Sequence, residues 1–212
     1  MTATVAVVDY GMGNLRSVCK AIEHIAPKQR VLLSGDPGVI RAADRVVFPG
    51  QGAIAGCMRA LAQGGLGEAV REAARTKPFL GICLGLQALF EESDEGGGVV
   101  ALGLLPGKVP LFQFTDGLRR KVPHMGWNRV RQQRRHPLWQ DIDDDSRFYF
   151  VHSYYAAPAN PADICGVTEY GLSFASAAGR DNIFAVQFHP EKSQQAGLTL
   201  LQNFCLWDGT AG

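Results

Sequence analysis

Cys83 lies in a local sequence that could make a cysteine nucleophilic. It stands between two glycines in GICLGLQ, residues 81–87, directly after the apolar segment PFL. The spacing G-x-C-x-G matches the nucleophile elbow, in which a strand turns sharply into a helix and presents the central side chain at the apex. A helix that begins near Leu84 would place the thiol beside unpaired amides and a helix dipole, which favour the thiolate. The alternative is an inert buried cysteine at a glycine-rich strand end.

A thiolate nucleophile also needs a base and a group that orients the base, and one histidine has a carboxylate close by in the sequence. In FAVQFHPEKS, His189 follows an apolar strand, Pro190 fixes a turn, and Glu191 comes two residues later. The turn could bring the carboxylate to the imidazole, where it would hold the tautomer and stabilise the imidazolium. Taken alone, His189 could also be a surface histidine at the end of a strand.

The other four histidines are poorer candidates for the base. His24 falls in an amphipathic helical pattern and His136 precedes a proline in a polar stretch, so we expect both at the surface. His124, in PHMGWN, and His152, in FVHSYY, are flanked by apolar and aromatic residues, and we expect both to be structural.

Two backbone amides could stabilise an oxyanion near the thiol. The first is the N–H of Leu84, which follows the cysteine at the elbow. The second would come from another loop at the same sheet edge, and Gly52 in FPGQGA is the candidate, because glycines let amides approach a ligand closely. Most P-G-x-G stretches are simply turns. GMGN near the N-terminus does not complete a dinucleotide fingerprint, because Arg16 stands where the third glycine belongs.

The composition narrows the classes of protein to consider. The chain has 212 residues, 46% of them hydrophobic, which suits a single domain over residues 1–212. With 21 basic and 20 acidic residues, we expect no nucleic-acid partner. Five cysteines without a C-x-x-C pair or a histidine at zinc spacing favour reduced thiols in the cytoplasm and no metal site. The apolar run near the N-terminus is too short for a signal peptide or a membrane span, so we expect no membrane association.

The first half of the chain alternates continuously apolar strands with helical patterns. This order predicts an α/β fold with a mostly parallel central sheet flanked by helices. Ligands in such folds gather beyond the carboxyl ends of the strands, where Tyr10, Gly50 and Cys83 all fall. The expected strands are 3–9, 30–34, 44–50 and 77–83, and the expected helices are 14–26, 53–63, 66–75 and 84–92.

After SDEGGG the pattern changes to shorter β-like segments with turns. They predict additional mixed or antiparallel strands, closed by a helix over SQQAGLTLLQNFCLW. EGGG at 95–98 is interpreted as a flexible connection, RVRQQRR at 129–135 as a solvated hairpin tip, and DIDDDS as an exposed acidic loop without calcium-binding spacing.

FPGQGA, GICLGLQ and QFHPEKS, in this order and spacing, resemble the class I glutamine amidotransferases over almost the whole chain. YGMGNLRSV, PHMGWN and YFVHSYY narrow the resemblance to the glutaminase subunits of imidazole glycerol phosphate synthases, in histidine biosynthesis. It implies that Cys83 attacks the carboxamide of glutamine, that His189 protonates the departing ammonia, and that water releases glutamate from a γ-glutamyl thioester. Glu191 would orient His189, and no cofactor is expected.

The resemblance also assigns roles to residues outside the triad. The matching positions make Gly52 and Leu84 the oxyanion donors. Gln87, Ser153 and Tyr154 would contact the amino-acid end of glutamine, with ordinary packing as the alternative.

A partner is implied as well. Family subunits dock on a (βα)8-barrel cyclase, which uses the ammonia to form imidazole glycerol phosphate and AICAR, and this chain has no barrel of its own. Asn14, Trp127 and Lys192 would lie near that interface. Without the resemblance, Trp127 reads as a core residue and Lys192 as a solvated charge. Gln51 departs from the family, which often has a small apolar residue such as valine there. It could alter a partner-sensitive oxyanion loop, or its amide could face solvent.

Three functions therefore stay open at this point. The first is an ammonia-donating amidotransferase subunit, the second a stand-alone hydrolase of another γ-glutamyl compound, and the third a non-catalytic scaffold. An intact Cys83, His189 and Glu191 set argues against the scaffold, and the partner-specific segments argue against the stand-alone hydrolase.

Overall fold

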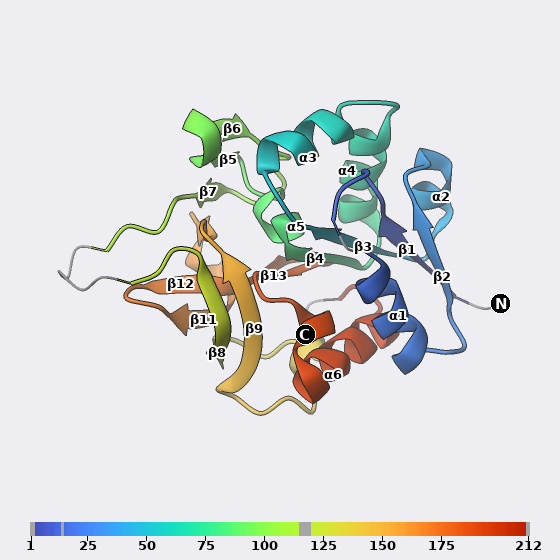
Figure 1. Ribbon diagram of the computed structural model, residues 1–212. Helices are drawn as coiled ribbons and strands as arrows, with labels where there is room; N and C mark the ends of the chain where they lie inside the picture. The colour runs from blue at the N-terminus through green and yellow to red at the C-terminus, as the bar shows by residue number, and fades with distance from the viewer. Residues whose placement is uncertain (1–2, 14, 115–119, 211–212) are drawn as a thin grey trace.

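The computed structural model describes residues 3–13, 15–114 and 120–210, which form a central sheet with helices on both faces (Figure 1). Asn14, an expected interface residue, lies outside the described ranges. The sheet has nine strands in the order β2-β1-β3-β4-β13-β12-β11-β8-β9. Their bounds are β1 Thr4–Val8, β2 Arg30–Ser34, β3 Arg45–Gly50, β4 Phe79–Cys83, β8 His124–Gln132, β9 Ser146–His152, β11 Ile164–Glu169, β12 Ser173–Arg180 and β13 Ile183–Val186.

The sheet changes character at β13. Strands β2, β1, β3, β4 and β13 are parallel, whereas β12, β11, β8 and β9 continue it with antiparallel pairs. This confirms the predicted parallel core with antiparallel additions. A separate small sheet in the order β10-β7-β5-β6 was not expected. Its strands are β5 Glu92–Ser93, β6 Val99–Val100, β7 Gly107–Val109 and β10 Ala157–Pro158.

Helices cover both faces of the parallel region. Successive residues of β1 point to opposite faces, so Val5 and Val7 pack with α1 and α6, while Ala6 and Val8 pack with α2, α3 and α4. The helices are α1 Leu15–Ile25, α2 Pro37–Ala42, α3 Ile54–Leu61, α4 Leu66–Thr76, α5 Leu84–Gln87 and α6 Gln194–Leu206. Helix α2 was not expected, and α5 is a single turn rather than the predicted nine residues.

Four short 3₁₀ helices complete the described chain: η1 Glu95–Gly97, η2 Pro137–Trp139, η3 Pro161–Asp163 and η4 Pro190–Lys192. His136 precedes η2 and was expected at the surface, which is wrong. Its side chain is buried, accepts a hydrogen bond from the N–H of Leu138 at 3.1 Å, and lies 4.4 Å from Phe184 between ring centroids. The proline begins a turn that folds the polar segment back onto the core.

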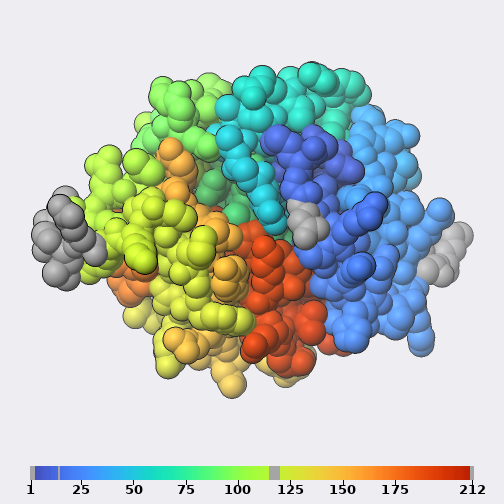
Figure 2. Space-filling view, in the orientation of Figure 1, coloured from blue at the N-terminus to red at the C-terminus, as the bar shows by residue number. Residues whose placement is uncertain are grey.

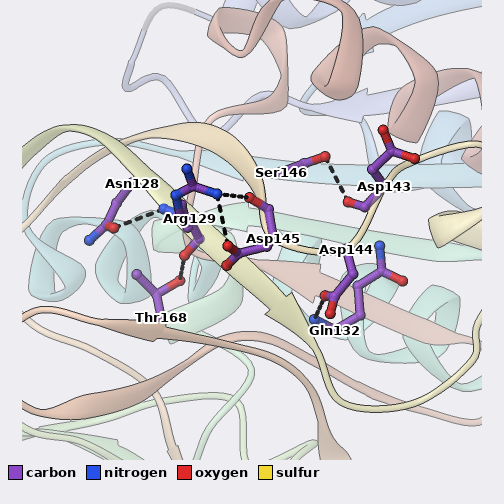
Figure 3. A network of polar contacts seen from close by, with 8 residues as sticks. All are labelled: Asn128, Arg129, Gln132, Asp143, Asp144, Asp145, Ser146 and Thr168. Carbon is purple, nitrogen blue, oxygen red and sulfur yellow. Dashed lines mark hydrogen bonds and ion pairs between the residues drawn. The ribbon is translucent and has the colours of Figure 1, made fainter.

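The predicted hairpin tip at 129–135 is only partly right, since residues 129–132 belong to strand β8 and residues 133–135 begin the connection to β9. The acidic stretch forms the end of that connection, and its aspartates are exposed as expected. Two of them contact β8 (Figure 3). Asp145 Oδ2 accepts from Arg129 at 2.8 Å and Asp144 Oδ1 accepts from the N–H of Gln132 at 2.7 Å. The stretch therefore closes the β8–β9 hairpin.

Across the described ranges, no helix is long and apolar enough to cross a membrane.

Candidate active site

The backbone at Cys83 has the predicted elbow geometry. Cys83 ends β4 and immediately precedes α5, with φ 55° and ψ −107°, a conformation that is strained for a residue with a side chain. A Cβ at Gly85 would lie 2.8 Å from the carbonyl carbon of Phe48 and closer still to its oxygen, and one at Gly81 would lie 3.0 Å from Ala185 Cβ. Gly85 is therefore sterically required, whereas a side chain at Gly81 would need its neighbours to shift by a few tenths of an ångström. Because α5 is only one turn long, its dipole adds little stabilisation to a negative charge at Cys83.

His189 and Glu191 form a buried pair beside this elbow. His189 Nδ1 lies 2.9 Å from Glu191 Oε1, and the two side chains are 2% and 1% exposed. Strand β9 holds the turn, because the N–H of His189 donates to the carbonyl of Tyr149 at 2.9 Å. Ser193 Oγ donates to the carbonyl of His189 at 2.6 Å. The spacing of two residues thus brings the carboxylate to the imidazole as predicted.

The sheet brings this pair to the cysteine. Strand β13 runs parallel to β4 with Ile82 opposite Val186, so the chain leaving β13 arrives at the carboxyl end of β4. Burial alone lowers the pKa of His189, but the charge and contact of Cys83 and the hydrogen bond and charge of Glu191 outweigh it and raise the pKa to about 10. The arrangement therefore favours the protonated, imidazolium form of His189.

The loop after β3 lies on the other side of the cysteine. Gly50, the last residue of β3, is the sheet partner of Cys83, so residues 51–53 lead away from a point beside the thiol. Gly52 has φ +89°, a region that favours glycine. Figure 2 shows the cyan chain around α3 adjoining the orange-red segment around α6 on one face of the molecule. The expected oxyanion donors, Gly52 and Leu84, both line the cavity described next.

A cavity of about 360 Å³ lies between the elbow, the loop after β3 and the segment around His189. The expected glutamine contacts Gln87, Ser153 and Tyr154 line it together with Cys83 and His189. The complete lining is Gln51, Gly52, Cys83, Leu84, Gln87, Glu95, Pro123, Val151, His152, Ser153, Tyr154 and His189. Within the described part of the chain no group of three or more His, Cys, Asp or Glu side chains is placed to hold a metal.

Comparison with known proteins identifies the family of this chain. The family model for class I glutamine amidotransferases matches residues 6–207. The chain belongs to the class I glutamine amidotransferase family. It is 60% identical to imidazole glycerol phosphate synthase subunit HisH of Aromatoleum aromaticum, covering 96% of this chain and 98% of that protein. It is 56% identical to subunit HisH 1 of Pseudomonas aeruginosa, covering 99% of each.

Solved amidotransferase structures share the fold at low sequence identity. A putative GMP synthase component from Thermoplasma acidophilum has a TM-score of 0.68 and 19% identity, covering 96% of this chain and 92% of that one. The glutaminase domain of Trypanosoma brucei CTPS with bound acivicin has a TM-score of 0.62 and 17% identity, covering 100% and 98%. These two comparisons support the fold alone.

Two polar residues of this amidotransferase site were missed in the sequence. Glu95, placed in a supposed flexible connection, lines the cavity, and its Oε2 accepts from the N–H of Ile54 at 2.9 Å at the start of α3. Gln187 is fully buried, and its Nε2 lies 3.7 Å from Cys83 Sγ. The one signal for Gln187 was a polar residue inside the apolar run FAVQF.

The hydrogen bonds fix the orientation of two amides beside the thiol. Gln87 Nε2 donates to the carbonyl of Tyr154 at 2.9 Å and to Gln187 Oε1 at 3.1 Å. Because a carbonyl only accepts, the nitrogen of Gln87 must face Tyr154, which leaves Gln187 Nε2 to donate toward Cys83 Sγ. The carbonyl of Val151 also lies near this thiol, at 4.0 Å from Sγ. An N–H directed at sulfur stabilises negative charge there.

Two of the residues expected at the partner interface, Trp127 and Lys192, are exposed, and Trp127 lines a hollow together with Ser193, the neighbour of Lys192. Trp127 is 40% exposed in β8, near Met125, which is 62% exposed, so the alternative of Trp127 as a core residue is wrong. Lys192 is exposed in η4, one residue after Glu191. Contact with a partner remains a prediction for both residues.

Proposed function

We propose that this chain hydrolyses L-glutamine to L-glutamate and ammonia as the glutaminase subunit of an imidazole glycerol phosphate synthase. The ammonia passes to a (βα)8-barrel cyclase subunit that makes imidazole glycerol phosphate and AICAR in L-histidine biosynthesis. The observation that carries the proposal is that Cys83 and His189 line one cavity and that Glu191 is hydrogen-bonded to His189, in a chain 60% identical to a protein named subunit HisH.

The first half-reaction forms the thioester. The Cys83 thiolate attacks the carboxamide carbon of glutamine, and the carbonyl electrons move to oxygen. The N–H groups of Gly52 and Leu84 stabilise that oxyanion. His189, held by Glu191, donates its proton to the departing nitrogen, so the C–N bond breaks and ammonia leaves.

The second half-reaction restores the enzyme. His189, now neutral, removes a proton from water, and the hydroxide attacks the thioester carbon. The C–S bond then breaks, glutamate is released, and the thiolate regains its imidazolium partner. Glu191 keeps the Nδ1–H of His189 directed at its own oxygen through both steps, 2.9 Å away.

The amino-acid end of glutamine fits the polar wall of the cavity. Both N–H bonds of Gln87 are used, so its Oε1 is left to accept from the α-ammonium group. The carboxylate of Glu95 supplies the complementary charge for that ammonium. Ser153 and Tyr154 face the α-carboxylate from the opposite segment.

The partner docks on the exposed region that holds Trp127 and Lys192, and by family resemblance Asn14 belongs to the same interface. The five cysteines are all unpaired and buried, which fits a cytoplasmic enzyme.

The deciding experiment measures glutamate release by the purified chain, alone and with a cyclase subunit plus its ribonucleotide ligand. We expect strong ligand-dependent stimulation that Cys83→Ala abolishes. Cys205→Ala, which truncates a buried thiol in α6, is the matched control and should retain activity. Full activity without the cyclase would instead identify a stand-alone hydrolase, and no release under any condition would leave a scaffold.

Gln51 gives this family member a distinct oxyanion loop. Its side chain is half-buried at the cavity, where the family often has valine. We propose that the larger polar side chain changes how the loop responds to the partner. Glutaminase stimulation should therefore differ between wild type and Gln51→Val, and equal stimulation would place the amide in solvent without a role.

A further inference from the structure

Two buried histidines next to the cavity have no part in the proposed reaction. His124 in β8 and His152 in β9 are direct cross-strand partners, and they are 3% and 5% exposed. His124 Nδ1 lies 2.9 Å from His152 Nε2. The His124 ring stacks on Tyr170 and Phe150, with centroids 4.0 and 4.9 Å away. The sequence predicted structural histidines here, but packing alone does not require hydrogen-bonding rings.

The hydrogen bonds of the pair run in one direction. His152 Nδ1 lies 2.8 Å from the carbonyl of Tyr154, which can only accept, so Nδ1 carries the hydrogen. In a neutral ring Nε2 must then accept, and His124 Nδ1 must donate to it. His124 Nε2 in turn accepts from Asn128 Nδ2 at 3.2 Å.

Asn128 fixes the start of this chain. Its Oδ1 accepts from the N–H of Arg129 at 2.8 Å (Figure 3). Nδ2 is therefore the end directed at His124. Nδ2 also donates to the carbonyl of Glu169 at 3.0 Å. Burial keeps both rings neutral, because it lowers the pKa of His124 to about 4 and that of His152 to about 3. The hydrogen bond to the carbonyl of Tyr154 opposes this decrease in His152, whereas the positive charge of His189 adds to it.

The chain ends at the wall of the cavity. The carbonyl of Tyr154 accepts from His152 on one side and from Gln87 Nε2 on the other, at 2.8 and 2.9 Å. Both acceptor positions of that oxygen are thus used by the protein. These two hydrogen bonds fix the position of the 153–154 backbone relative to the Gln87 amide.

We propose that His124 and His152 are positioning residues. Their hydrogen bonds, which all run in one direction, hold the Tyr154 carbonyl and the Gln87 amide in the arrangement that binds the amino-acid end of glutamine. The inference rests on the proposed function, since it concerns the same substrate. The pair acts on parts of the substrate far from the scissile bond, so it changes ground-state and transition-state binding together.

The test separates KM from kcat in the complex with the cyclase and its ligand. His124→Phe keeps a ring between Tyr170 and Phe150 but leaves His152 Nε2 without a donor. We expect KM for glutamine to rise about tenfold, the factor that corresponds to one lost hydrogen bond, with kcat changed much less. His124→Asn places an N–H near the position of Nδ1 and should restore most of the affinity.

His136→Phe is the matched control. It also removes a hydrogen bond from a buried histidine, the one to the N–H of Leu138, but it lies outside the cavity lining. Its KM should stay within about twofold of wild type, because distant sites act independently. An unchanged KM in folded His124→Phe, or an equal rise in the control, would overturn the proposal.

Two measurements do not depend on turnover. Glutamine affinity can be measured by calorimetry in Cys83→Ala, with and without His124→Phe. If Cys83→Ala binds glutamine and the added His124→Phe substitution leaves the affinity unchanged, the positioning role of His124 and His152 is refuted while the proposed function stands. If the wild type neither binds nor hydrolyses glutamine, the proposed function is refuted as well. Nitrogen-15 NMR of the wild type should show the Nδ1–H tautomer in both rings, and an Nε2–H tautomer in either would refute the directed chain.

Discussion

Replacing Gly85 by alanine should disrupt the elbow that presents the thiol. The added methyl would lie 2.8 Å from the carbonyl carbon of Phe48, and closer to its oxygen, on the adjoining strand β3. Ordinary carbon contacts begin at about 3.5 Å, so backbone must move by about 0.7 Å or more. Neither partner is a flexible side chain, because Phe48 is locked in register opposite Gly81 of β4.

The expected loss follows from this overlap. Overpacking costs about 1–3 kcal/mol, and a clash of backbone with a new Cβ belongs at the upper end. For a chain of this length about 3 kcal/mol lowers Tm by roughly 6–12 °C. A shift of the elbow by a fraction of an ångström also misplaces the nucleophile, so kcat should fall by about 100-fold.

Thermal unfolding followed by circular dichroism, together with glutamate release, measures both effects. Gly38→Ala is the control, since its Cβ would meet only the side chain of Asp36, at 3.2 Å, within helix α2. Its Tm should stay close to wild type. A Gly85→Ala protein with wild-type Tm and wild-type kcat would refute the steric account of the elbow.

Three further outcomes follow from the buried groups. Glu191→Gln keeps the size of the side chain but removes the charge beside His189 Nδ1. Because a hydrogen bond to a charged group is stronger than one to a neutral group, kcat in steady-state assays should fall at least about tenfold, with KM little changed. A kcat equal to that of wild type would contradict the orienting role of Glu191. Gln187→Leu removes the N–H directed at Cys83 Sγ and should lower kcat by about tenfold, whereas a change confined to Tm would mean packing only. The raised pKa of His189 means that the folded state binds its proton more tightly than the unfolded state. Its contribution to the free energy of unfolding is therefore complete below about pH 6.5 and is lost as pH rises through about 10. Because Cys83 is the main cause of the increase, urea unfolding of Cys83→Ala should show a smaller decline over this range, and an equal decline would refute the coupling.

Most of the geometry of the candidate site could be predicted from the sequence, because it depends on residues that lie close together in the chain. The elbow needs glycines two residues before and after Cys83, and the base pair needs His189 and Glu191 two residues apart, so spacing alone predicted both. Apolar runs predicted the strands of the parallel region, since strands buried on both faces leave a continuous pattern.

Residues whose role depends on distant pairing were not predictable. Glu95 lies in a glycine-rich stretch that reads as a linker, and it acquires its place by accepting from Ile54, 41 residues earlier in the chain. Gln187 has a role only because Gln87, 100 residues away, donates to it. His136 looked exposed because its neighbours are polar, whereas the turn at η2 buries it.

The position of β13 between β4 and β12 has a consequence for how the protein is made. About 100 residues separate Cys83 from Ile183, so β4 is synthesised long before the strand that pairs with it. Until that strand emerges, β4 is an unpaired sheet edge, and the cysteine has neither its histidine nor its glutamate. A nascent or prematurely terminated chain therefore presents Cys83 without the two side chains that the proposed mechanism requires. Under that mechanism, glutaminase activity begins only when nearly the whole chain has left the ribosome and β13 has paired with β4.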